Sequence, residues 1–352
     1  MLTAAGVLNR ALKTLVHIVP KRSTFPTLES VLIEPADGGV AITATDLTAE
    51  ARIVVPATDA FPTCLPARPL LEFVASLDRD AAVMLAQHGD TVRVAAAGAT
   101  IDLPQRPPSE FPKTLAHTGT VNAVKDPDAF LEGLSWVARA VGNDETRPQL
   151  MGVLLDGDAS VGCDGHRLHR VVTTGLGCPK ALVPANAIAL VLRALKGQPI
   201  EINVGKTTAR FRSPSCAITT RLIDALYPTY AQVIPMASGA SFSMKVGAVD
   251  LSAGLKRVCG RASRRSDKTM KLSANGAIKL ETSGDDVQRA VTVGVLETTH
   301  QGDDHVQGFN PWYLQEALAD LDAVASLRFY DAEGPLLIEA GERTAVVMPC
   351  RL

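Results

Sequence analysis

The chain repeats one pattern of apolar residues three times, and this repetition limits its folds more than any other feature. Leu8, Leu12 and Leu15 have the i, i+4, i+7 spacing that is typical of the buried stripe of a helix. The same spacing recurs in two later sets, which are Phe130, Leu134, Val137 and Leu251, Leu255, Val258. We therefore search for an internal repeat before any other organisation.

A second helical stripe follows the first in each repeat. Its three sets are Leu70, Val74, Leu77, then Ile188, Leu192, Leu195, and then Leu314, Leu318, Leu321. Pro66, Pro184 and Asn310 precede these sets, and proline or asparagine suits the start of a helix. Each repeat is therefore expected to contain two helices.

Short runs of alternating apolar residues follow the helices and predict antiparallel strands. After the second helices they are Ala82–Leu85 with Thr91–Ala95, Ile200–Val204 with Thr208–Phe211, and Ser326–Phe329 with Leu336–Glu339. After the first helices they include Ser30–Glu34 with Val40–Thr43, and Gly152–Leu155 with Ser160–Cys163. One repeat thus reads as helix, strands, helix, strands.

The fold class that follows is α+β, with three similar domains that each combine two helices with antiparallel sheets. A length of 352 residues exceeds one ordinary domain. We expect boundaries that give domains 1–118, 119–238 and 239–352, with linkers near Leu115–Asn122 and Met236–Phe242. The alternative is an unrelated α+β chain with chance periodicity, and three matched helix pairs in the same order argue against it.

Composition indicates a cytoplasmic protein without a membrane anchor. The six cysteines are scattered without a C-x-x-C pair, which argues against a disulfide framework and a zinc site. No apolar run approaches the roughly 18 residues of a membrane span, and the first residues lack the basic start of a signal peptide. The net charge of -2 differs from that of an ordinary basic DNA binder, although cations confined to one face would still suit DNA.

Several local segments resemble one known family. Residues 24–28 (T-F-P-T-L) lead into Ser30–Glu34, Asp164–Leu168 reads D-G-H-R-L, and the chain ends Met348–Leu352 (M-P-C-R-L). Together with 221–230 (R-L-I-D-A-L-Y-P-T-Y), they resemble the bacterial DNA polymerase III beta subunits, the sliding clamps. The resemblance covers the whole chain, in register with the three repeats.

This resemblance implies a non-catalytic processivity factor of DNA replication that needs no cofactor. In the family, two chains join head to tail into a homodimeric ring of six domains around double-stranded DNA. Helices line the hole and sheets form the outer wall. The implied partners are the DNA polymerase III alpha subunit, a clamp loader ATPase, and other polymerases and repair proteins with clamp-binding peptides. The alternative is a paralogous or mobile-element clamp with altered partner specificity.

A sliding protein should attract phosphates without gripping base edges, because it has to move. The face of the helices opposite the apolar stripe should therefore carry Lys and Arg, although any one cation could equally belong to an ordinary solvated helix face. The candidates are Arg10, Lys13, Arg22, Arg139, Arg147, Arg193, Lys196, Arg257, Arg261, Arg264 and Arg265. The last helix does not conform, because Glu316, Asp320 and Asp322 dominate it.

The resemblance also implies a groove between the second and third domains that accepts a short partner peptide. The matching positions are Leu150, Gly165, His166, Arg167, Leu168, Pro228, Val233, Asn310, Tyr313, Met348, Pro349, Arg351 and Leu352. Apolar walls with a flexible methionine suit several related peptides. The sequence departs from the family at Cys163, Gln232, Cys350, the polar loop near 266–268 and the expected interface near Arg261.

Two other signals do not add up to a site. Gly205–Thr207 (G-K-T) lacks the glycine that a P-loop needs five positions earlier, where Ile200 stands, and it joins two strands. His166 and His169 form H-x-x-H without further ligands for zinc, and His166 is expected to be structural. We find no pair of acid and base for catalysis.

Overall fold

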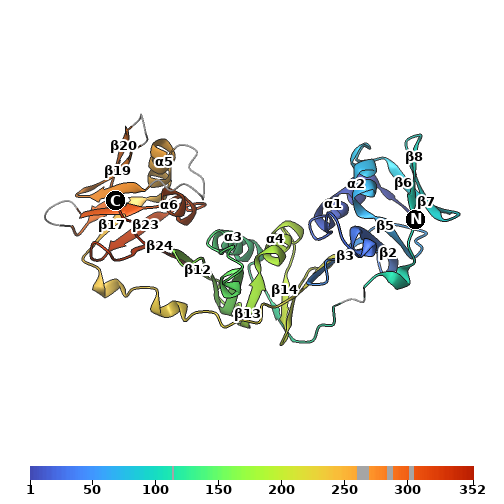
Figure 1. The fold of residues 1–352 in the computed structure, drawn as a ribbon, viewed down its shortest axis with the longest axis horizontal. Helices are drawn as coiled ribbons and strands as arrows, with labels where there is room; N and C mark the ends of the chain where they lie inside the picture. Colours follow the sequence, from blue (N-terminus) through green and yellow to red (C-terminus); the bar gives the residue numbers. More distant parts are fainter. Residues whose placement is uncertain (113–114, 260–268, 284–287, 301–304) are drawn as a thin grey trace. The chain divides into compact units, whose positions relative to one another are not determined.

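The computed structural model describes residues 1–112, 115–259, 269–283, 288–300 and 305–352, and it contains the same order of elements three times (Figure 1). The order is strand, helix, three strands, strand, helix, three strands, and the third repeat adds one short strand before its second helix. The first repeat comprises β1 Leu2–Ala4, α1 Ala5–Leu15, β2 Ser30–Ala36, β3 Gly39–Thr45, β4 Ala49–Val55, β5 Thr63–Pro66, α2 Ala67–Ala75, β6 Ala82–His88, β7 Thr91–Ala96 and β8 Ala99–Pro104.

The second and third repeats follow the same plan. The second comprises β9 Thr120–Ala123, α3 Pro127–Ala138, β10 Gly152–Gly157, β11 Ala159–Cys163, β12 Arg167–Val172, β13 Cys178–Pro184, α4 Ala185–Ala194, β14 Glu201–Val204, β15 Thr208–Arg212 and β16 Cys216–Arg221. The third comprises β17 Phe242–Gly247, α5 Ala248–Cys259, β18 Met270–Ala274, β19 Ala277–Ser283, β20 Gln288–Gly294, the short β21 Glu297–Thr298, β22 His305–Phe309, α6 Pro311–Ala317, β23 Val324–Phe329, β24 Leu336–Ala340 and β25 Arg343–Val347.

The first-helix stripes are confirmed as core. Leu8, Leu12 and Leu15 are fully buried on α1, and the corresponding residues of α3 and α5 are also buried. The second stripes were read one turn too long, because the helices end before their last members. Leu77 lies beyond the end of α2 and Leu321 beyond the end of α6. Because the apolar period continues into the turn after each helix, the sequence does not show where the helix ends.

The predicted strand pairs are confirmed as antiparallel neighbours. In every predicted pair the two runs fall on adjacent strands, such as β6 with β7, β14 with β15 and β23 with β24. The turn at 205–207 joins β14 to β15, as expected for a segment that is not a P-loop. Alternation along β7 buries Val92, Val94 and Ala96 while the intervening side chains are partly exposed.

The chain divides into two compact units, and each unit is built from two stretches of sequence. Unit 1 contains Met1–Asp128 and Asn186–Leu222, and unit 2 contains Ala129–Ala185 and Ile223–Leu352. In unit 1, α1 packs against α2, and α1 covers β3 and β4. In unit 2, α5 packs against α6 and covers β17, β19 and β20. No helix of the described part of the chain is long and apolar enough to cross a membrane.

Sheets run without interruption from one repeat into the next. In unit 1 an eight-stranded sheet has the order β5-β2-β3-β4-β16-β15-β14-β9, so β4 pairs with β16. In unit 2 a nine-stranded sheet has the order β13-β10-β11-β12-β25-β24-β23-β17-β21, so β12 pairs with β25. Two four-stranded sheets, β1-β6-β7-β8 and β20-β19-β18-β22, complete the described strands and leave β8 and β20 at their edges.

Candidate partner-binding groove

A tight turn between β11 and β12 separates an exposed histidine from a buried arginine. Asp164 Oδ1 accepts hydrogen bonds from the backbone N–H groups of His166 (2.9 Å) and Arg167 (3.0 Å). Gly165 has φ +92°, a backbone conformation that residues other than glycine rarely adopt. The turn therefore presents His166 to solvent and directs Arg167 inward, where only 3% of the residue is exposed.

The Arg167 guanidinium is held by partners from three elements. Its Nε lies 3.1 Å from Asp164 Oδ2, and its Nη1 forms an ion pair with Glu316 of α6. Its Nη2 donates to the carbonyl oxygen of Arg139, just after the end of α3. The guanidinium carbon also lies 4.5 Å from the centroid of the Tyr313 ring. The guanidinium thus has hydrogen bonds through Nε and Nη2 and an ion-pair contact through Nη1.

Tyr313 and His166 form an aromatic wall above this arginine. Their ring centroids are 6.4 Å apart and the planes differ by 18°. Burial raises the pKa of the Tyr313 phenol, and the nearby Asp164 charge acts in the same direction. The phenol is therefore neutral near pH 7 and offers an O–H group beside an apolar face.

Backbone hydrogen bonds fix the C-terminal tail beside this wall. The Met348 N–H donates to the His166 carbonyl oxygen (2.9 Å), and the Cys350 N–H donates to the Gly308 carbonyl oxygen of β22 (2.7 Å). A Cβ atom on Gly308 would lie 2.5 Å from the Cys350 carbonyl oxygen. The tail can therefore lie here only because residue 308 has no side chain, and it leaves Leu352 exposed.

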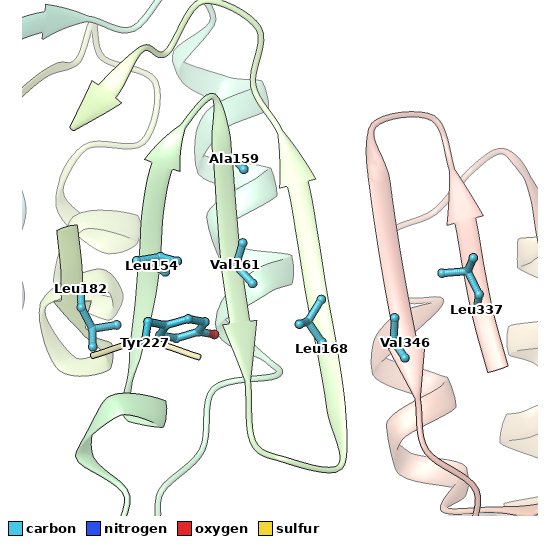
Figure 2. Close-up of a cluster of buried hydrophobic side chains, with 8 residues drawn as sticks. All are labelled: Leu154, Ala159, Val161, Leu168, Leu182, Tyr227, Leu337 and Val346. Atoms are coloured by element: carbon cyan, nitrogen blue, oxygen red, sulfur yellow. The ribbon is translucent and has the colours of Figure 1, made fainter. Parts of the chain in front are cut away.

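An apolar cluster lies beneath the strands that carry the turn and the tail. It joins Leu168 of β12 to Val346 and Leu337 of the next repeat, together with Tyr227 (Figure 2). The remaining members are Leu154, Ala159, Val161 and Leu182, with Cys163, Ile223, Tyr230, Ile234 and Tyr330 packed against them. The cluster spans the paired strands β12 and β25, so residues from both repeats support the turn and the tail.

All the predicted groove residues lie in unit 2, but they do not all face solvent. Arg167, Leu168 and Leu150 are buried, and the Asn310 side chain accepts from the Trp312 N–H (2.9 Å) as the N-cap of α6. The exposed or half-exposed ones are Gly165, His166, Pro228, Val233, Tyr313, Met348, Pro349, Arg351 and Leu352. The candidate surface is therefore smaller than the predicted set.

One residue of the site escaped the sequence analysis. Glu316 was read as part of an acidic helix surface, whereas it is buried and paired with Arg167. Its position three residues after Tyr313, on the same helix face, was the available signal. The buried His169 stacks on Trp136 (centroids 4.3 Å apart) and is structural, because burial lowers its pKa to about 3 and leaves it neutral.

The predicted DNA-binding residues fall into three groups. Six are exposed on the described helices or just after them, and they are Arg10, Lys13, Arg22, Arg193, Lys196 and Arg257. Two are engaged with carboxylates, since Arg139 pairs with Asp320 and Arg147 with Asp144 (2.9 Å). Arg261, Arg264 and Arg265, the loop at 266–268 and the interface expected near 261 lie outside the described residues.

Comparison with known proteins agrees with this architecture. Residues 4–115 match the model of the DNA polymerase III beta subunit, N-terminal domain, and residues 126–229 match that of its central domain. The beta sliding clamp of Caulobacter vibrioides is 26% identical over 357 residues, which cover 95% of this chain and 94% of that protein. The beta sliding clamp of Escherichia coli K12 is 25% identical and covers 94% of each chain.

A solved structure resembles the whole chain. The crystal structure of the C. crescentus beta sliding clamp, with PEG bound to its putative beta-motif tethering region, superposes with a TM-score of 0.88. It is 25% identical and the match covers 100% of this chain and 98% of that one. The repeated α+β domains, the two matched family models and the full-length relatives lead to one conclusion: the chain belongs to the bacterial DNA polymerase III beta subunit family, the sliding clamps.

Proposed function

We propose that two copies of this sliding clamp close head to tail into a ring around duplex DNA, as a processivity factor that tethers polymerases without catalysis of its own. Each copy contributes three domains, 1–118, 119–238 and 239–352. The proposal places the ring in the cytoplasm, where a separate clamp loader ATPase opens it onto DNA.

The observation that carries this proposal is the set of strands that joins one repeat to the next. Strand β4 of the first repeat pairs with β16 of the second, and β12 of the second pairs with β25 of the third. The corresponding strands left over are β20 of the third repeat and β8 of the first, and both are sheet edges. An unpaired edge is a template for another strand. Pairing β20 with β8 of a second copy repeats the same joint and closes a two-chain ring.

The two existing joints also predict the register of this pairing. Glu50 lies opposite Thr219 in the first joint, and Leu168 opposite Val346 in the second. Both joints have the same register. Glu50 and Leu168 each pair back across a four-residue turn, with Thr45 and Cys163. Thr219 and Val346 are each the fourth residue after a two-residue turn, at 214–215 and 341–342. The same counting therefore applies to the two edge strands.

Counted in this way, Gln288 should lie opposite Asp102 of the other copy. Val291 should then lie opposite Ala99. This register makes the proposed joint specific and testable, because a slip by one residue would exchange the two faces of the strand.

Exposed cations on the helices suit a protein that slides. Arg10 and Lys13 of α1 project from the face opposite its buried leucines, and Arg193 of α4 and Arg257 of α5 are also exposed. Attraction between such side chains and phosphates is independent of base sequence, so it holds DNA without fixing a position. The net charge of -2 is compatible with this arrangement, because only the surface that faces DNA needs to be positive.

The groove supplies the second half of the function. Met348 and Val233 are exposed apolar residues, and the Tyr313–His166 wall adds aromatic surface. Such a groove suits a short linear peptide, with apolar side chains in contact and a few polar groups fixing the backbone. The partners we propose are the DNA polymerase III alpha subunit, the clamp loader, and other polymerases and repair proteins.

Two measurements test the proposal. Light scattering at micromolar concentration should give twice the chain mass of 37.1 kDa. After loading, the protein should remain on a closed circular plasmid and leave the same plasmid once it has been cut. Equal retention on both forms would show local binding and would contradict a topological clamp.

A further inference from the structure

The role of the buried Arg167 is not explained by its place among the predicted partner-binding residues. Arg167 is 3% exposed and its guanidinium is already in contact with Asp164, Glu316 and the Arg139 carbonyl oxygen, so it is poorly placed to meet a partner directly. We propose that Glu316 is a positioning residue, which with Asp164 holds the Arg167 guanidinium against Tyr313 and thereby fixes the aromatic wall for an incoming peptide. This inference rests on the proposed peptide-binding function of the groove.

The first joint of the chain, where β4 pairs with β16, serves as an internal control. The turn between β3 and β4 has the same construction, with Asp46 Oδ1 accepting from the N–H groups of Thr48 (2.9 Å) and Ala49 (2.7 Å). Thr45 pairs with Glu50 as Cys163 pairs with Leu168, so Ala49 occupies the position that corresponds to Arg167. The joint between β4 and β16 nevertheless forms.

The helix at the first joint lacks the other members as well. Counted from the start of each helix, Ala187 of α4 corresponds to Tyr313 of α6, and Leu190 corresponds to Glu316. A cavity of about 170 Å³ remains there, and Asp46, Ala49, Ala187 and Leu190 are among its lining residues. The fold therefore completes this joint without an arginine, a glutamate or an aromatic ring.

It follows that the Arg167 and Glu316 pair serves something other than the joint. Burying two charges costs desolvation that their attraction does not reliably recover, so such a pair is poor evidence of a need for stability. The pair is well suited to fixing geometry, because the planar guanidinium is bonded to the turn, to α3 and to α6 at once. The Tyr313 ring lies against this plane, at 4.5 Å from the guanidinium carbon.

A Tyr313 side chain that is already fixed should favour peptide binding. Ordering a side chain during association opposes binding, so a wall that is already ordered binds more tightly than a mobile one. Glu316→Gln keeps the shape of the side chain and removes the charge that holds the guanidinium. The Tyr313 ring should then become mobile while the backbone joint between β12 and β25 persists.

The test uses the full chain, with two readouts. The first is the ¹⁹F NMR resonance of Tyr313 in 3-fluorotyrosine-labelled protein, which is assigned with Tyr313→Phe. The second is the affinity for the DNA polymerase III alpha subunit of the same bacterium. We expect Glu316→Gln to shift or broaden the Tyr313 resonance and to weaken polymerase binding by about tenfold, a size typical of coupled residues. The matched control is Glu297→Gln, which removes the exposed ion pair between Glu297 of β21 and Lys245 of β17 and should change neither readout.

A double-mutant cycle separates positioning from a general loss of structure. In a Tyr313→Ala background, Glu316→Gln should cause no further loss of affinity, because its effect passes through the ring. An unchanged Tyr313 resonance, or a full additional loss in that background, would overturn the inference. If Glu316→Gln does not fold, Glu316→Asp gives the same two readouts with the charge retained but displaced.

The two proposals can fail separately. A wild-type protein that binds no polymerase, but whose Tyr313 resonance still responds to Glu316→Gln, would contradict the proposed partner and support the positioning role. A wild-type protein that binds the polymerase with unchanged affinity after Glu316→Gln would support the partner and contradict the positioning role.

Discussion

At the scale of single residues, burial decides which groups can ionise. His169 is fully buried, stacks on Trp136, and has its Nδ1 3.0 Å from the Trp136 carbonyl oxygen. The Trp136 indole N–H in turn donates to the Ala317 carbonyl oxygen of α6 (3.1 Å). A neutral histidine with a proton on Nδ1 satisfies this arrangement, and a charged one would place an unsolvated cation in the core.

This arrangement predicts that the protein becomes less stable in mild acid. Burial lowers the pKa of His169 to about 3 in the folded state, below the ordinary histidine value of about 6.5, so the unfolded chain binds more protons between these values. Stability should therefore fall as pH drops below about 6.5, by up to about 1.4 kcal/mol per pH unit from this one group. Urea unfolding of His169→Gln should show a flatter pH profile than wild type. The exposed His88→Gln is the control, and a flattening of equal size there would contradict the assignment.

A second prediction concerns the glycine under the C-terminal tail. A side chain at Gly308 would meet the Cys350 carbonyl oxygen at 2.5 Å and the Thr269 side chain at 2.7 Å. Gly308→Ala should therefore displace the tail, destabilise the protein by about 1–3 kcal/mol, and weaken polymerase binding. Carboxypeptidase digestion measures release of the tail. Gly294→Ala, where nothing lies within 4 Å, should leave digestion at the wild-type rate.

At the scale of elements, local periodicity predicted which segments are helices or strands, and contacts between distant segments decided the rest. The stripes of α1, α3 and α5 and the alternating strands were predictable, because each depends on neighbouring positions in one segment. The ends of α2 and α6 were not, since the apolar period continues past them. Glu316 was misread for a related reason, because its burial depends on Arg167 of another repeat.

The helix surface gives a prediction about salt. Arg10 and Lys13 lie one turn apart on α1 and both are exposed. If both contact phosphates, replacing them with Gln should reduce the slope of log affinity against log salt by about 0.9 for each lost contact. DNA binding measured over a series of salt concentrations tests this. Lys180→Gln, an exposed lysine on β13, should leave the slope unchanged, and an equal change there would show a general charge effect.

At the scale of the whole molecule, strand pairing joins the first repeat to the second and the second repeat to the third. The sequence predicted three domains but not the pairs β4–β16 and β12–β25, because strands so far apart share no local signal. The existence of a groove could be expected from family resemblance. The division of its residues into exposed surface, buried support and helix cap depends on packing.

The proposed ring closure can be trapped covalently. The proposed pair of Ala99 and Val291 corresponds to Cys216 and Ile53, which lie opposite each other in the first joint. The neighbouring pair, Val54 and Ser215, is hydrogen-bonded, so the pair of Cys216 and Ile53 is a non-hydrogen-bonded one. Such non-hydrogen-bonded pairs bring Cα atoms to about 4.5 Å, within the range of a disulfide. In a Cys350→Ser background, Ala99→Cys with Val291→Cys should oxidise to a dimer on a non-reducing gel. Ala99→Cys with Ala290→Cys, which points to the other face, should remain monomeric, and equal cross-linking of both would exclude the register.

The joints between repeats have a consequence for how freely the sequence can change. They are made by main-chain hydrogen bonds of paired strands, and the main chain is the same for almost every amino acid. Each joint therefore tolerates different side chains where the strand pairing itself is kept, which explains how Ala49 and Arg167 can occupy equivalent positions. Substitutions at one joint can therefore accumulate while the other joint stays unchanged. A chain that is only 25% identical to the C. crescentus clamp can in this way share its architecture, with a TM-score of 0.88.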